Sequence, residues 1–553
     1  MAAAAALIRC CPRLNCLLST PMFATRLHWN FLLCLAATLC LEAALCEPVQ
    51  AQTPAHPYPQ HIVYAPGTIY PTNYTQAQID ADVATFYDYW KQTYVKAAGV
   101  DTGGHQLYRI AFGKTTPDSA ATVSEGQGYG MVILPLMAGH DPDAHAVFDG
   151  LAAFAAAYPS VNDSRLMQWK VPVDPGDTGD SAFDGDADIA YGLMLADAQW
   201  GSAGSVNYLQ SATNHLAGIL ASTIGPQSRL PMLGDWVSPN AKDYNQYQPR
   251  TSDIMPSHFR AWARLTGNTV WNDVATNCAV VVDSLQANYS PATGLLPDFS
   301  IGANPLTSVH PAAANFLEGA DDGHYSYNAG RDPWRLALDA LLNGNAKSGT
   351  QAKSISTWLK TKVSGNPLNI RAGYLLNGSN ITGNNYFTSF FVAPVGVASM
   401  LDVNNQAWLN AIYASVRTDH EDYYEDSVTL LSLLAMSGNY WDPTTIANQP
   451  QAVRLYALPP DGTMHLSAAT GTPALNFNVS AQAGTFAFTV ERTTDLRTWT
   501  TVAQRASGAG SFQASVSGIT IQETPQSQMT SVQISDALPW TGGERFYRLR
   551  VVR

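Results

Sequence analysis

Residues 183–200 read Phe-Asp-Gly-Asp-Ala-Asp-Ile-Ala-Tyr-Gly-Leu-Met-Leu-Ala-Asp-Ala-Gln-Trp, and this stretch indicates the fold class. Its apolar residues recur at spacings of three and four, which predicts an apolar helix. Three acids open that helix at alternate positions: Asp184, Asp186 and Asp188. Capping and the helix dipole explain two acids at a helix start. The third acid indicates that this helix end carries chemistry.

The same helical spacing recurs from about residue 76 to residue 436, interrupted by breaks rich in Gly, Pro, Asn and Asp. Segments expected to be helical include 79–95, 144–158, 187–200, 272–286, 333–342, 352–363, 407–416 and 427–436. There are roughly a dozen such segments, most of them short and paired. We therefore predict six helical hairpins around one axis.

Length and composition limit the classes of protein. The chain has 553 residues, of which 46% are hydrophobic and 13% charged, with 13 Trp and 25 Tyr. These values exclude a disordered, collagenous or long coiled-coil protein, and the length predicts more than one domain. The net charge of -13 argues against nucleic acid or an anionic membrane as a partner.

Residues 1–51 have the pattern of a signal peptide. Arg26 precedes an apolar run at 31–41, and the small-residue pattern at 49–51 offers a cleavage site. We expect a secreted or periplasmic protein without membrane contact once this segment is removed. A retained anchor is the alternative, but the run is short for a membrane span. Lipid attachment at Cys46 is another, although Leu45 stands where a small residue is usual.

Cysteine usage is unusual for an exported chain. Six of the seven cysteines lie in residues 1–51, which leaves Cys278 alone in the remainder. No disulfide is then expected within the mature chain. Cys278 lies in an apolar stretch, and we interpret it as a buried small hydrophobic residue rather than a nucleophile.

After Pro443 the sequence pattern changes from helical apolar spacing to strand-like alternation. The segments 474–480, 485–491 and 546–552 alternate apolar and polar residues, as half-buried strands do. We expect a small β-sandwich here. The predicted domains are a signal peptide at 1–51, a helical barrel at 52–445 and a β-sandwich accessory domain at 446–553. The accessory domain is expected to be a spacer or attachment domain, with a carbohydrate-binding face as the alternative.

A second informative stretch, residues 123–131, reads Val-Ser-Glu-Gly-Gln-Gly-Tyr-Gly-Met. The glycines after Glu125 would let a bulky substrate approach the backbone closely. Alternatively, Glu125 is only a helix N-terminal charge favoured by the dipole. A calcium loop at the acids of 184–188 is a further alternative, but the distal Glu of such a loop is missing because position 195 is Leu.

Together, residues 124–131 and 182–190 resemble the acid motif and the signature of glycoside hydrolase family 8. The stretches 167–171 and 235–238 also lie where the family has them, although Phe183 replaces the usual Ser or Thr. The resemblance covers about residues 75–440. It implies an (α/α)6 barrel that cleaves β-1,4-linked glycans with inversion. The expected fold class is therefore an all-α (α/α)6 barrel followed by an all-β sandwich.

The motif Tyr-Asn-Ala at 327–329 decides the branch of the family. The cellulase-like and xylanase-like branch has an Asp base where this chain has Asn328. An amide cannot take a proton from water at neutral pH. The sequence resembles the branch of chitosanases and lichenan-cleaving enzymes, which has Asn there and a Glu base about ten residues upstream. Glu318 matches that position, and Asp321 and Asp322 are the alternatives.

The resemblance implies a role for each candidate residue. Glu125 is the expected general acid and Glu318 the general base. Asp184 is expected to position the sugar, and its charge would help to keep Glu125 protonated. No metal or organic cofactor is expected. The candidate substrate-binding residues are Tyr129, Trp169, Trp236, Asp253, His258, Tyr325, Asn328 and Arg331. Arg331, with Asp332 and Arg335, is alternatively part of a buried ion-pair network. For Asp253 and His258, a structural role is an equal alternative.

The predicted function is a secreted, inverting endo-glycoside hydrolase that acts as a monomer on a polysaccharide. Chitosan is the preferred substrate, because a polycation is attracted to an acidic protein. The alternatives are a β-1,3-1,4-glucanase (licheninase) or a β-1,4-endoglucanase (cellulase). A different class also stays open: a catalytically silent glycan-binding or wall-associated protein, for which Asn328 would be the explanation.

Overall fold

The structure is a computed structural model that describes residues 53–446, 466–467, 474–480, 487–493, 498–508, 510–525, 529–537 and 546–552. The predicted signal peptide, with its cleavage site and the alternative anchors, lies outside the described residues. Within the described residues, we find no helix with the length and apolar character that a membrane crossing requires.

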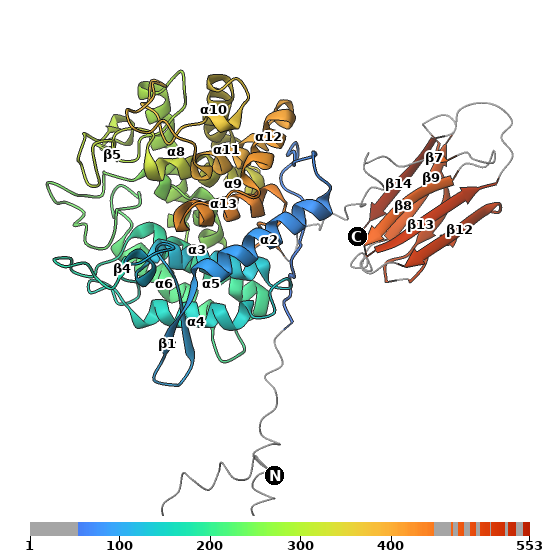
Figure 1. Cartoon of the computed structure of the whole chain (residues 1–553), viewed down its shortest axis with the longest axis horizontal. Helices are drawn as coiled ribbons and strands as arrows, with labels where there is room; N and C mark the ends of the chain where they lie inside the picture. The colour runs from blue at the N-terminus through green and yellow to red at the C-terminus, as the bar shows by residue number, and fades with distance from the viewer. Residues whose placement is uncertain are drawn as a thin grey trace, which may run out of the picture. The chain divides into compact units, whose positions relative to one another are not determined.

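The helical part contains twelve α-helices within residues 53–446, arranged in two concentric layers (Figure 1). They are α2 (Gln76–Tyr94), α3 (Ser124–Met137), α4 (Ala144–Ala157), α5 (Phe183–Trp200), α6 (Tyr208–Ser222), α7 (Pro256–Thr266), α8 (Val270–Tyr289), α9 (Asp332–Asn343), α10 (Ala346–Lys362), α11 (Ser389–Ser399), α12 (Gln406–Val416) and α13 (Tyr423–Met436). The odd-numbered helices form the inner ring, and each even-numbered helix packs against an inner neighbour. The predicted (α/α)6 barrel is confirmed.

Burial explains which helices form the inner ring. Every residue of α11 is buried, and so is almost every residue of α3, α5 and α13. A helix that is apolar on all sides must be covered on all sides. The outer helix α2 instead buries one stripe at spacings of three and four, which includes Ile79, Val83 and Trp90. Cys278 is free and buried in α8, as predicted.

Helices α3 and α5 approach each other closely through glycines. A Cβ added at Gly128 would lie 2.7 Å from Cβ of Asp188, and one at Gly192 would lie 2.7 Å from the carbonyl oxygen of Met131. A Cβ at Gly130 would meet Ile110 at 2.8 Å. The expectation that these glycines admit substrate is therefore wrong for Gly128 and Gly130. They allow the helix to pack against its protein neighbours.

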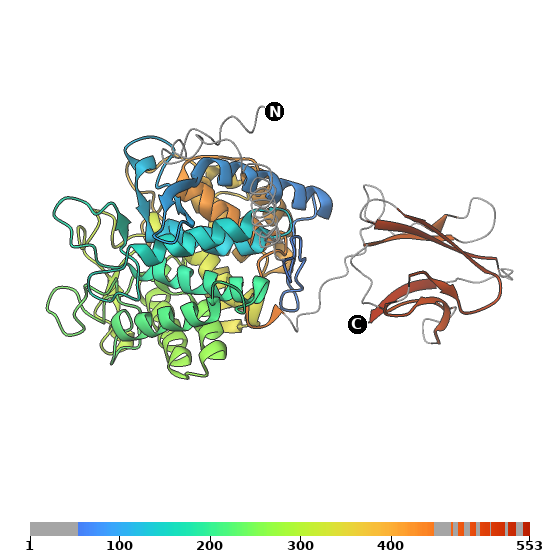
Figure 2. The ribbon, with the colours of Figure 1, turned by 90° about the horizontal axis from the view of Figure 1, so that it is seen from below.

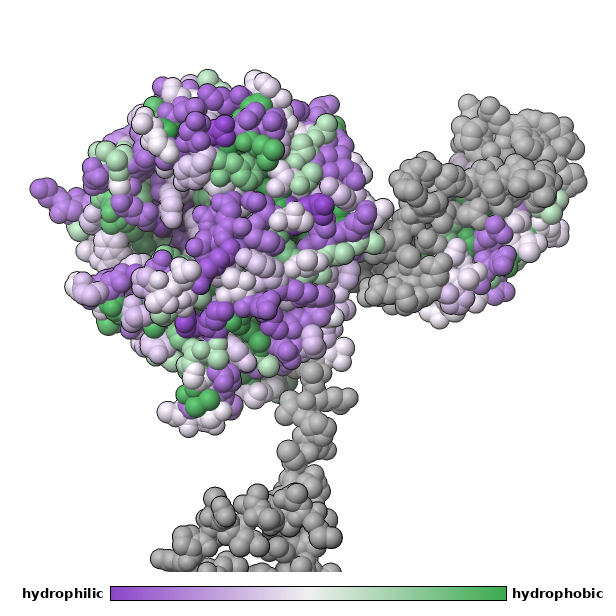
Figure 3. Space-filling model, viewed as in Figure 1, coloured by the Kyte–Doolittle hydropathy of each residue, from purple (hydrophilic) through white to green (hydrophobic). Residues whose placement is uncertain are grey.

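Short strands connect some of the helices. Strands β1 (Val95–Val100) and β2 (Gln106–Ile110) form an antiparallel hairpin. The two-residue pairs are β3 (Thr122–Val123) with β4 (Lys170–Val171), and β5 (Ser300–Ile301) with β6 (His310–Pro311). The pairing of β3 with β4 fixes the chain just before α3. On the face of the helical part in Figure 3, polar and small apolar groups are mixed.

The described C-terminal residues form two four-stranded antiparallel sheets. One has the order β11 (Gln513–Ala514), β10 (Thr500–Arg505), β9 (Ala487–Thr493), β14 (Phe546–Val552), and the other β12 (Ile519–Pro525), β13 (Met529–Asp536), β8 (Ala474–Ser480), β7 (Leu466–Ser467). Phe477 and Ile534 of one sheet share a hydrophobic cluster with Phe488 and Val490 of the other. Figure 2 shows the two sheets one above the other.

Candidate active site

Glu125 lies in the first turn of α3 and has three polar partners. The hydroxyls of Tyr129 and Tyr423 donate to its two carboxyl oxygens at 3.0 and 2.9 Å, and Arg331 donates through Nη1. Its side chain is 15% exposed. Burial raises the pKa of Glu125; the charge of Arg331 opposes this and that of Asp184 adds to it. The residue is therefore suited to hold a proton.

Asp184 lies at the start of α5 and faces two guanidinium groups. Arg331 Nη1 donates to its Oδ2 at 2.9 Å, and Arg250 Nη1 lies 3.9 Å from the same oxygen. The backbone N–H of Gly185 donates to Oδ1 at 2.9 Å. Burial acts to raise the pKa of Asp184, but the two arginines outweigh it and lower the pKa. This carboxyl is an anion beside the more protonated Glu125.

The other two acids of the alternating run, Asp186 and Asp188, have different partners. Asp186 accepts from the N–H of Met167 at 2.9 Å and lies 2.9 Å from Nε2 of His215. Asp188 is paired with both terminal nitrogens of Arg335, at 3.0 and 2.5 Å. The three alternating acids thus contact three separate sets of partners. Among the described residues, no group of acids, histidines or cysteines is arranged to hold a metal ion.

Glu318 lies in the long connection before α9, and its side chain is 41% exposed. Arg250 donates to its Oε1 through Nη2, and Asn328 Nδ2 donates to its Oε2 at 3.1 Å. Asp322, an alternative base in the sequence analysis, instead accepts backbone N–H bonds from residues 317, 318 and 319 at 2.7, 3.1 and 2.8 Å. Asp322 therefore shapes the turn that presents Glu318.

Asn328 lies in the 3-10 helix η5 (Tyr327–Arg331) and joins three side chains. Its Nδ2 donates to Glu318 and, at 3.3 Å, to Oδ2 of Asp298, while its Oδ1 accepts from the hydroxyl of Tyr424 at 2.9 Å. Burial raises the pKa of Asp298 to about 7; Arg250 opposes this shift and Glu318 adds to it. Asp298 is thus a fourth carboxyl of the site, after Glu125, Asp184 and Glu318, and it contacts Asn328.

These contacts place the two candidate glutamates in one site. Arg331 connects Glu125 to Asp184, and Arg250 connects Asp184 to Glu318. The ring of Tyr327 is 62% exposed. It stacks on the ring of Tyr424 at a centroid distance of 5.7 Å, and burial and the charges of Glu125 and Glu318 all act to raise its pKa. The starts of α3, α5, α9 and α13 meet here.

Five of the predicted substrate-binding residues contact other protein side chains. Arg331 is fully buried and donates to both Glu125 and Asp184. This arrangement agrees with the alternative that Arg331 belongs to a buried ion-pair network. Asn328 contacts Glu318. Trp169 is half-buried and donates through Nε1 to Asp177 at 2.6 Å, and half-buried Trp236 packs on Tyr244. Tyr129 is buried, so it contacts Glu125 rather than a sugar face.

The other three predicted substrate-binding residues, His258, Tyr325 and Asp253, are buried. His258 is buried between Asp188, at 2.9 Å, and the stacked ring of Tyr191. Tyr325 is fully buried against Phe391. Asp253 is also buried, in the 3-10 turn η3 (Thr251–Asp253) before α7. All three are buried in the barrel interior.

Sequence reasoning missed five residues that complete the site. They are Arg250, Asp298, Tyr327, Tyr423 and Tyr424. Their signal was weak because each is a single polar residue in a connection or at a helix start. The pair Tyr-Tyr at 423–424 does follow two acids directly before an apolar helix, a pattern typical of a helix start, but this pattern does not indicate a site.

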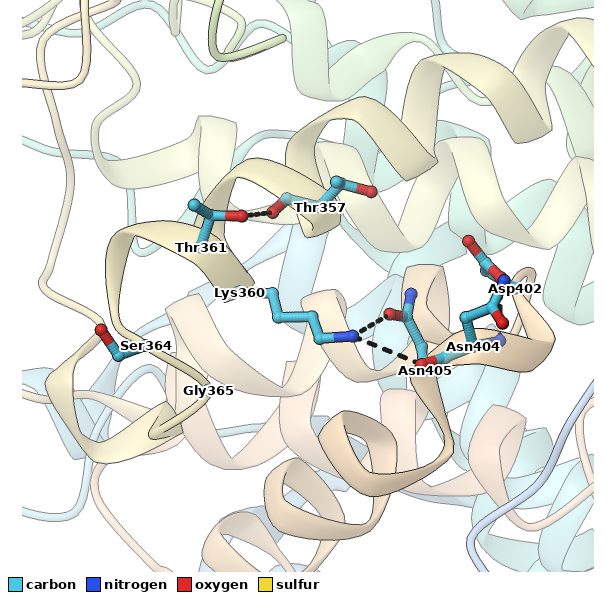
Figure 4. A pocket seen from close by; sticks show the side chains of 8 residues that line it. All are labelled: Thr357, Lys360, Thr361, Ser364, Gly365, Asp402, Asn404 and Asn405. Carbon is cyan, nitrogen blue, oxygen red and sulfur yellow. Dashed lines mark hydrogen bonds between the residues drawn. The ribbon is translucent and has the colours of Figure 1, made fainter.

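A separate hollow lies elsewhere on the helical part. It has a volume of about 460 Å³ and is lined by the C-terminal half of α10, the loop after it and the 3-10 helix η7 (Val403–Asn405). Figure 4 shows Lys360 in this hollow, donating to Oδ1 of Asn405 at 2.8 Å. None of the candidate catalytic residues lines it.

The family model for glycosyl hydrolases family 8 matches residues 68–438. The chain belongs to this family. It is therefore a glycoside hydrolase, as the sequence predicted. A beta-glucanase of Niallia circulans is 41% identical over 411 residues, which is 73% of this chain and 97% of the relative. An endoglucanase of Bacillus sp. (strain KSM-330) is 38% identical over 392 residues, 70% of this chain and 82% of the relative.

Solved structures of family 8 agree with this assignment. The apo structure of a beta-1,3-1,4-glucanase from Paenibacillus sp. X4 matches with a TM-score of 0.66 and 41% identity, over 70% of this chain and all of that one. A cold-adapted family 8 xylanase matches with a TM-score of 0.55 at 20% identity, over 70% and 98% of the two chains. The xylanase likeness supports the fold alone.

Proposed function

We propose that this family 8 enzyme is an inverting endo-glucanase that cleaves mixed-linkage β-1,3-1,4-glucan. The observation that carries the proposal is the pair of glutamates joined through Arg331, Asp184 and Arg250. One is largely buried with a raised pKa, and the other is partly exposed on a loop. Such asymmetry between two carboxyls is what acid–base hydrolysis of a glycosidic bond requires.

In the proposed reaction, Glu125 gives its proton to the leaving glycosidic oxygen as the bond to the anomeric carbon breaks. Glu318 accepts a proton from a water whose oxygen bonds to that carbon from the opposite face. Inverting enzymes hold these carboxyls about 6.5 to 9.5 Å apart, which leaves room for the water. The anion of Asp184 stabilises the positive charge that develops on the sugar ring.

The substrate assignment corrects the preference for chitosan. That preference depended on the net charge of the chain, which many acidic exported proteins share. The comparisons give chitosan no support, whereas a relative and a solved structure at 41% identity are a beta-glucanase and a beta-1,3-1,4-glucanase. A β-1,4-endoglucanase is the second candidate, because the relative at 38% identity is named an endoglucanase.

The proposal also covers the rest of the chain. We infer a signal peptide at 1–51, export to the periplasm or medium, and a monomeric enzyme. The two C-terminal sheets with their shared hydrophobic cluster support a β-sandwich accessory domain at 446–553 that acts as a spacer or attachment module. Purification from culture medium with N-terminal sequencing tests the first of these inferences.

Reducing-end release from barley β-glucan, carboxymethyl cellulose and chitosan tests the proposed activity. We expect the highest kcat/KM on β-glucan and a loss of at least about a hundredfold on it for Glu125→Gln and for Glu318→Gln. Asp321→Asn is the matched control in the same loop and should stay within about threefold of the wild type. Full activity of Glu318→Gln, or turnover of chitosan alone, would contradict the proposal.

A further inference from the structure

We propose that Tyr424 and Asp298 hold the side-chain amide of Asn328 in one orientation, and that Asn328 thereby positions the carboxylate of Glu318 for its reaction with water. The inference deepens the proposed function and rests on Glu318 being the general base. It makes Asn328 a positioning residue rather than the trace of a lost catalytic base or a direct sugar contact.

The hydrogen bonds of the amide select one orientation. An amide has two N–H donors and a carbonyl acceptor. Here Nδ2 donates to Glu318 Oε2 at 3.1 Å and to Asp298 Oδ2 at 3.3 Å, while Oδ1 accepts from the hydroxyl of Tyr424 at 2.9 Å. A flipped amide would turn its carbonyl oxygen towards two carboxyl groups. Buried in this way, Asn328 keeps its donors on the Glu318 side.

Glu318 needs a partner that fixes its side chain, because no residue of its own loop bonds to its carboxylate in the described structure. It lies in a long connection, and its two side-chain partners among the described residues are Arg250 and Asn328. Arg250 is shared, because it also lies 3.9 Å from both Asp184 and Asp298 and stacks on the ring of Phe299. The hydrogen bond from the uncharged amide of Asn328 is thus the contact that holds Oε2 of Glu318 in place.

The partners of Asn328 are anchored in the barrel. Tyr424 lies in the first turn of α13, where its ring packs on Phe390 at a centroid distance of 4.4 Å. Asp298 is buried, and its N–H donates to the carbonyl of His324 at 2.8 Å. An Asp at position 328 would add a carboxylate between Asp298 and Glu318, where like charges repel. An amide supplies the donor without that charge.

The test uses Tyr424→Phe, which removes only the hydroxyl, and Asn328→Ala. We expect each to lower kcat on β-glucan about tenfold or more with KM changed less than about threefold. Loss of the donor to Glu318 should also move the acidic limb of the kcat/KM profile to higher pH. The charged and titratable groups that face Glu318 are Arg250, Asp298 and Tyr327, with Asp322 beneath its loop.

Two comparisons separate positioning from a general structural defect. Tyr413→Phe removes another buried hydroxyl that donates to a carboxylate, that of Asp82 at 3.1 Å. These two residues lie on the outer helices α12 and α2, so the variant should leave kcat and the pH profile unchanged. The double variant Tyr424→Phe with Asn328→Ala should be no slower than Asn328→Ala alone, because Tyr424 acts through Asn328.

The outcomes distinguish this inference from the proposed function. If Glu318→Gln is inactive but the two variants keep the wild-type kcat and acidic limb, the positioning role is wrong and the base assignment stands. Multiplied losses in the double variant would also overturn it, since Tyr424 would then act independently. If Glu318→Gln is fully active, the proposed function itself fails.

Discussion

Glu125 and Asp184 accept hydrogen bonds from the same nitrogen, Nη1 of Arg331. One buried cation thus serves the proposed acid and the proposed sugar-positioning anion, which come from α3 and α5. Asp184 has a lowered pKa and Glu125 a raised one, so the shared guanidinium does not make the two carboxyls equivalent. Burial acts to raise the pKa of both carboxyls, so the difference follows from the second arginine, Arg250, and from the N–H of Gly185, which both lie beside Asp184.

Arg331→Met should be strongly destabilising. It leaves Asp184 without its main cation inside the barrel, and breaking a buried ion pair in this way costs about 3–5 kcal/mol. We expect that loss in the free energy of unfolding, measured by urea denaturation of the helical part near neutral pH. Arg371→Met, at a half-exposed arginine, is the control and should change it by less than about 0.5 kcal/mol. Equal effects would contradict the account.

Gly128→Ala should destabilise the protein although alanine favours a helix by about 1 kcal/mol. The new Cβ would lie 2.7 Å from Cβ of Asp188 and 2.8 Å from the carbonyl oxygen of Gly185, so α3 and α5 must move apart. Overpacking of this kind costs about 1–3 kcal/mol. Gly204→Ala, where nothing lies within 4 Å, is the control for thermal melting. A raised Tm for Gly128→Ala would refute the packing role.

Asp253 should make stability depend on pH. Burial raises the pKa of Asp253 from 3.8 to about 8. The charge of Asp184 adds to this shift, and that of Arg250 opposes it. Between these values the folded protein keeps a proton that the unfolded chain has lost, so the contribution of Asp253 to stability falls as pH rises. Asp253→Asn cannot ionise. Its Tm relative to the wild type should therefore increase from about pH 5 to about pH 8; a constant difference would show that Asp253 does not titrate there.

Asp322→Ala should impair catalysis through the loop. The three backbone N–H bonds that Asp322 accepts from residues 317–319 would be lost, and Glu318 would no longer be held in one place. We expect kcat on β-glucan to fall about tenfold or more. A base role for Asp322 predicts instead that Asp322→Asn and Asp322→Ala are equally inactive and that Glu318→Gln is active.

Much of the barrel could be predicted because its helices keep regular apolar spacing. Each segment quoted in the sequence analysis overlaps one helix and extends at most one residue beyond its end, as 144–158 does on α4. Helices α3 and α11 were harder to predict because each contains an internal proline, Pro135 or Pro394, and α3 is rich in glycine. Burial on all sides stabilises them, which a periodic pattern does not reveal.

The site residues that belong to long motifs could be predicted from the sequence. Single residues that other helices or connections contribute to the site could not. Glu125, Asp184 and Glu318 come from quoted motifs, and the structure brings them together. The cationic link Arg250 and the hydroxyl of Tyr424 depend on how η3 and α13 meet α9. The position of His258 could not be predicted, because side chains leave a helix in all directions and the sequence does not show which of them face the site. Its side chain lies against Asp188 in the interior.

The anomeric form of the first product tests the central claim most directly. Proton NMR of barley β-glucan hydrolysis, followed from the first minutes before mutarotation, reports which face of the sugar the water attacks. If Glu125 and Glu318 act as acid and base on opposite faces, the new reducing ends appear first as the α-anomer. First appearance of the β-anomer would mean a covalent, retaining route and would contradict the account.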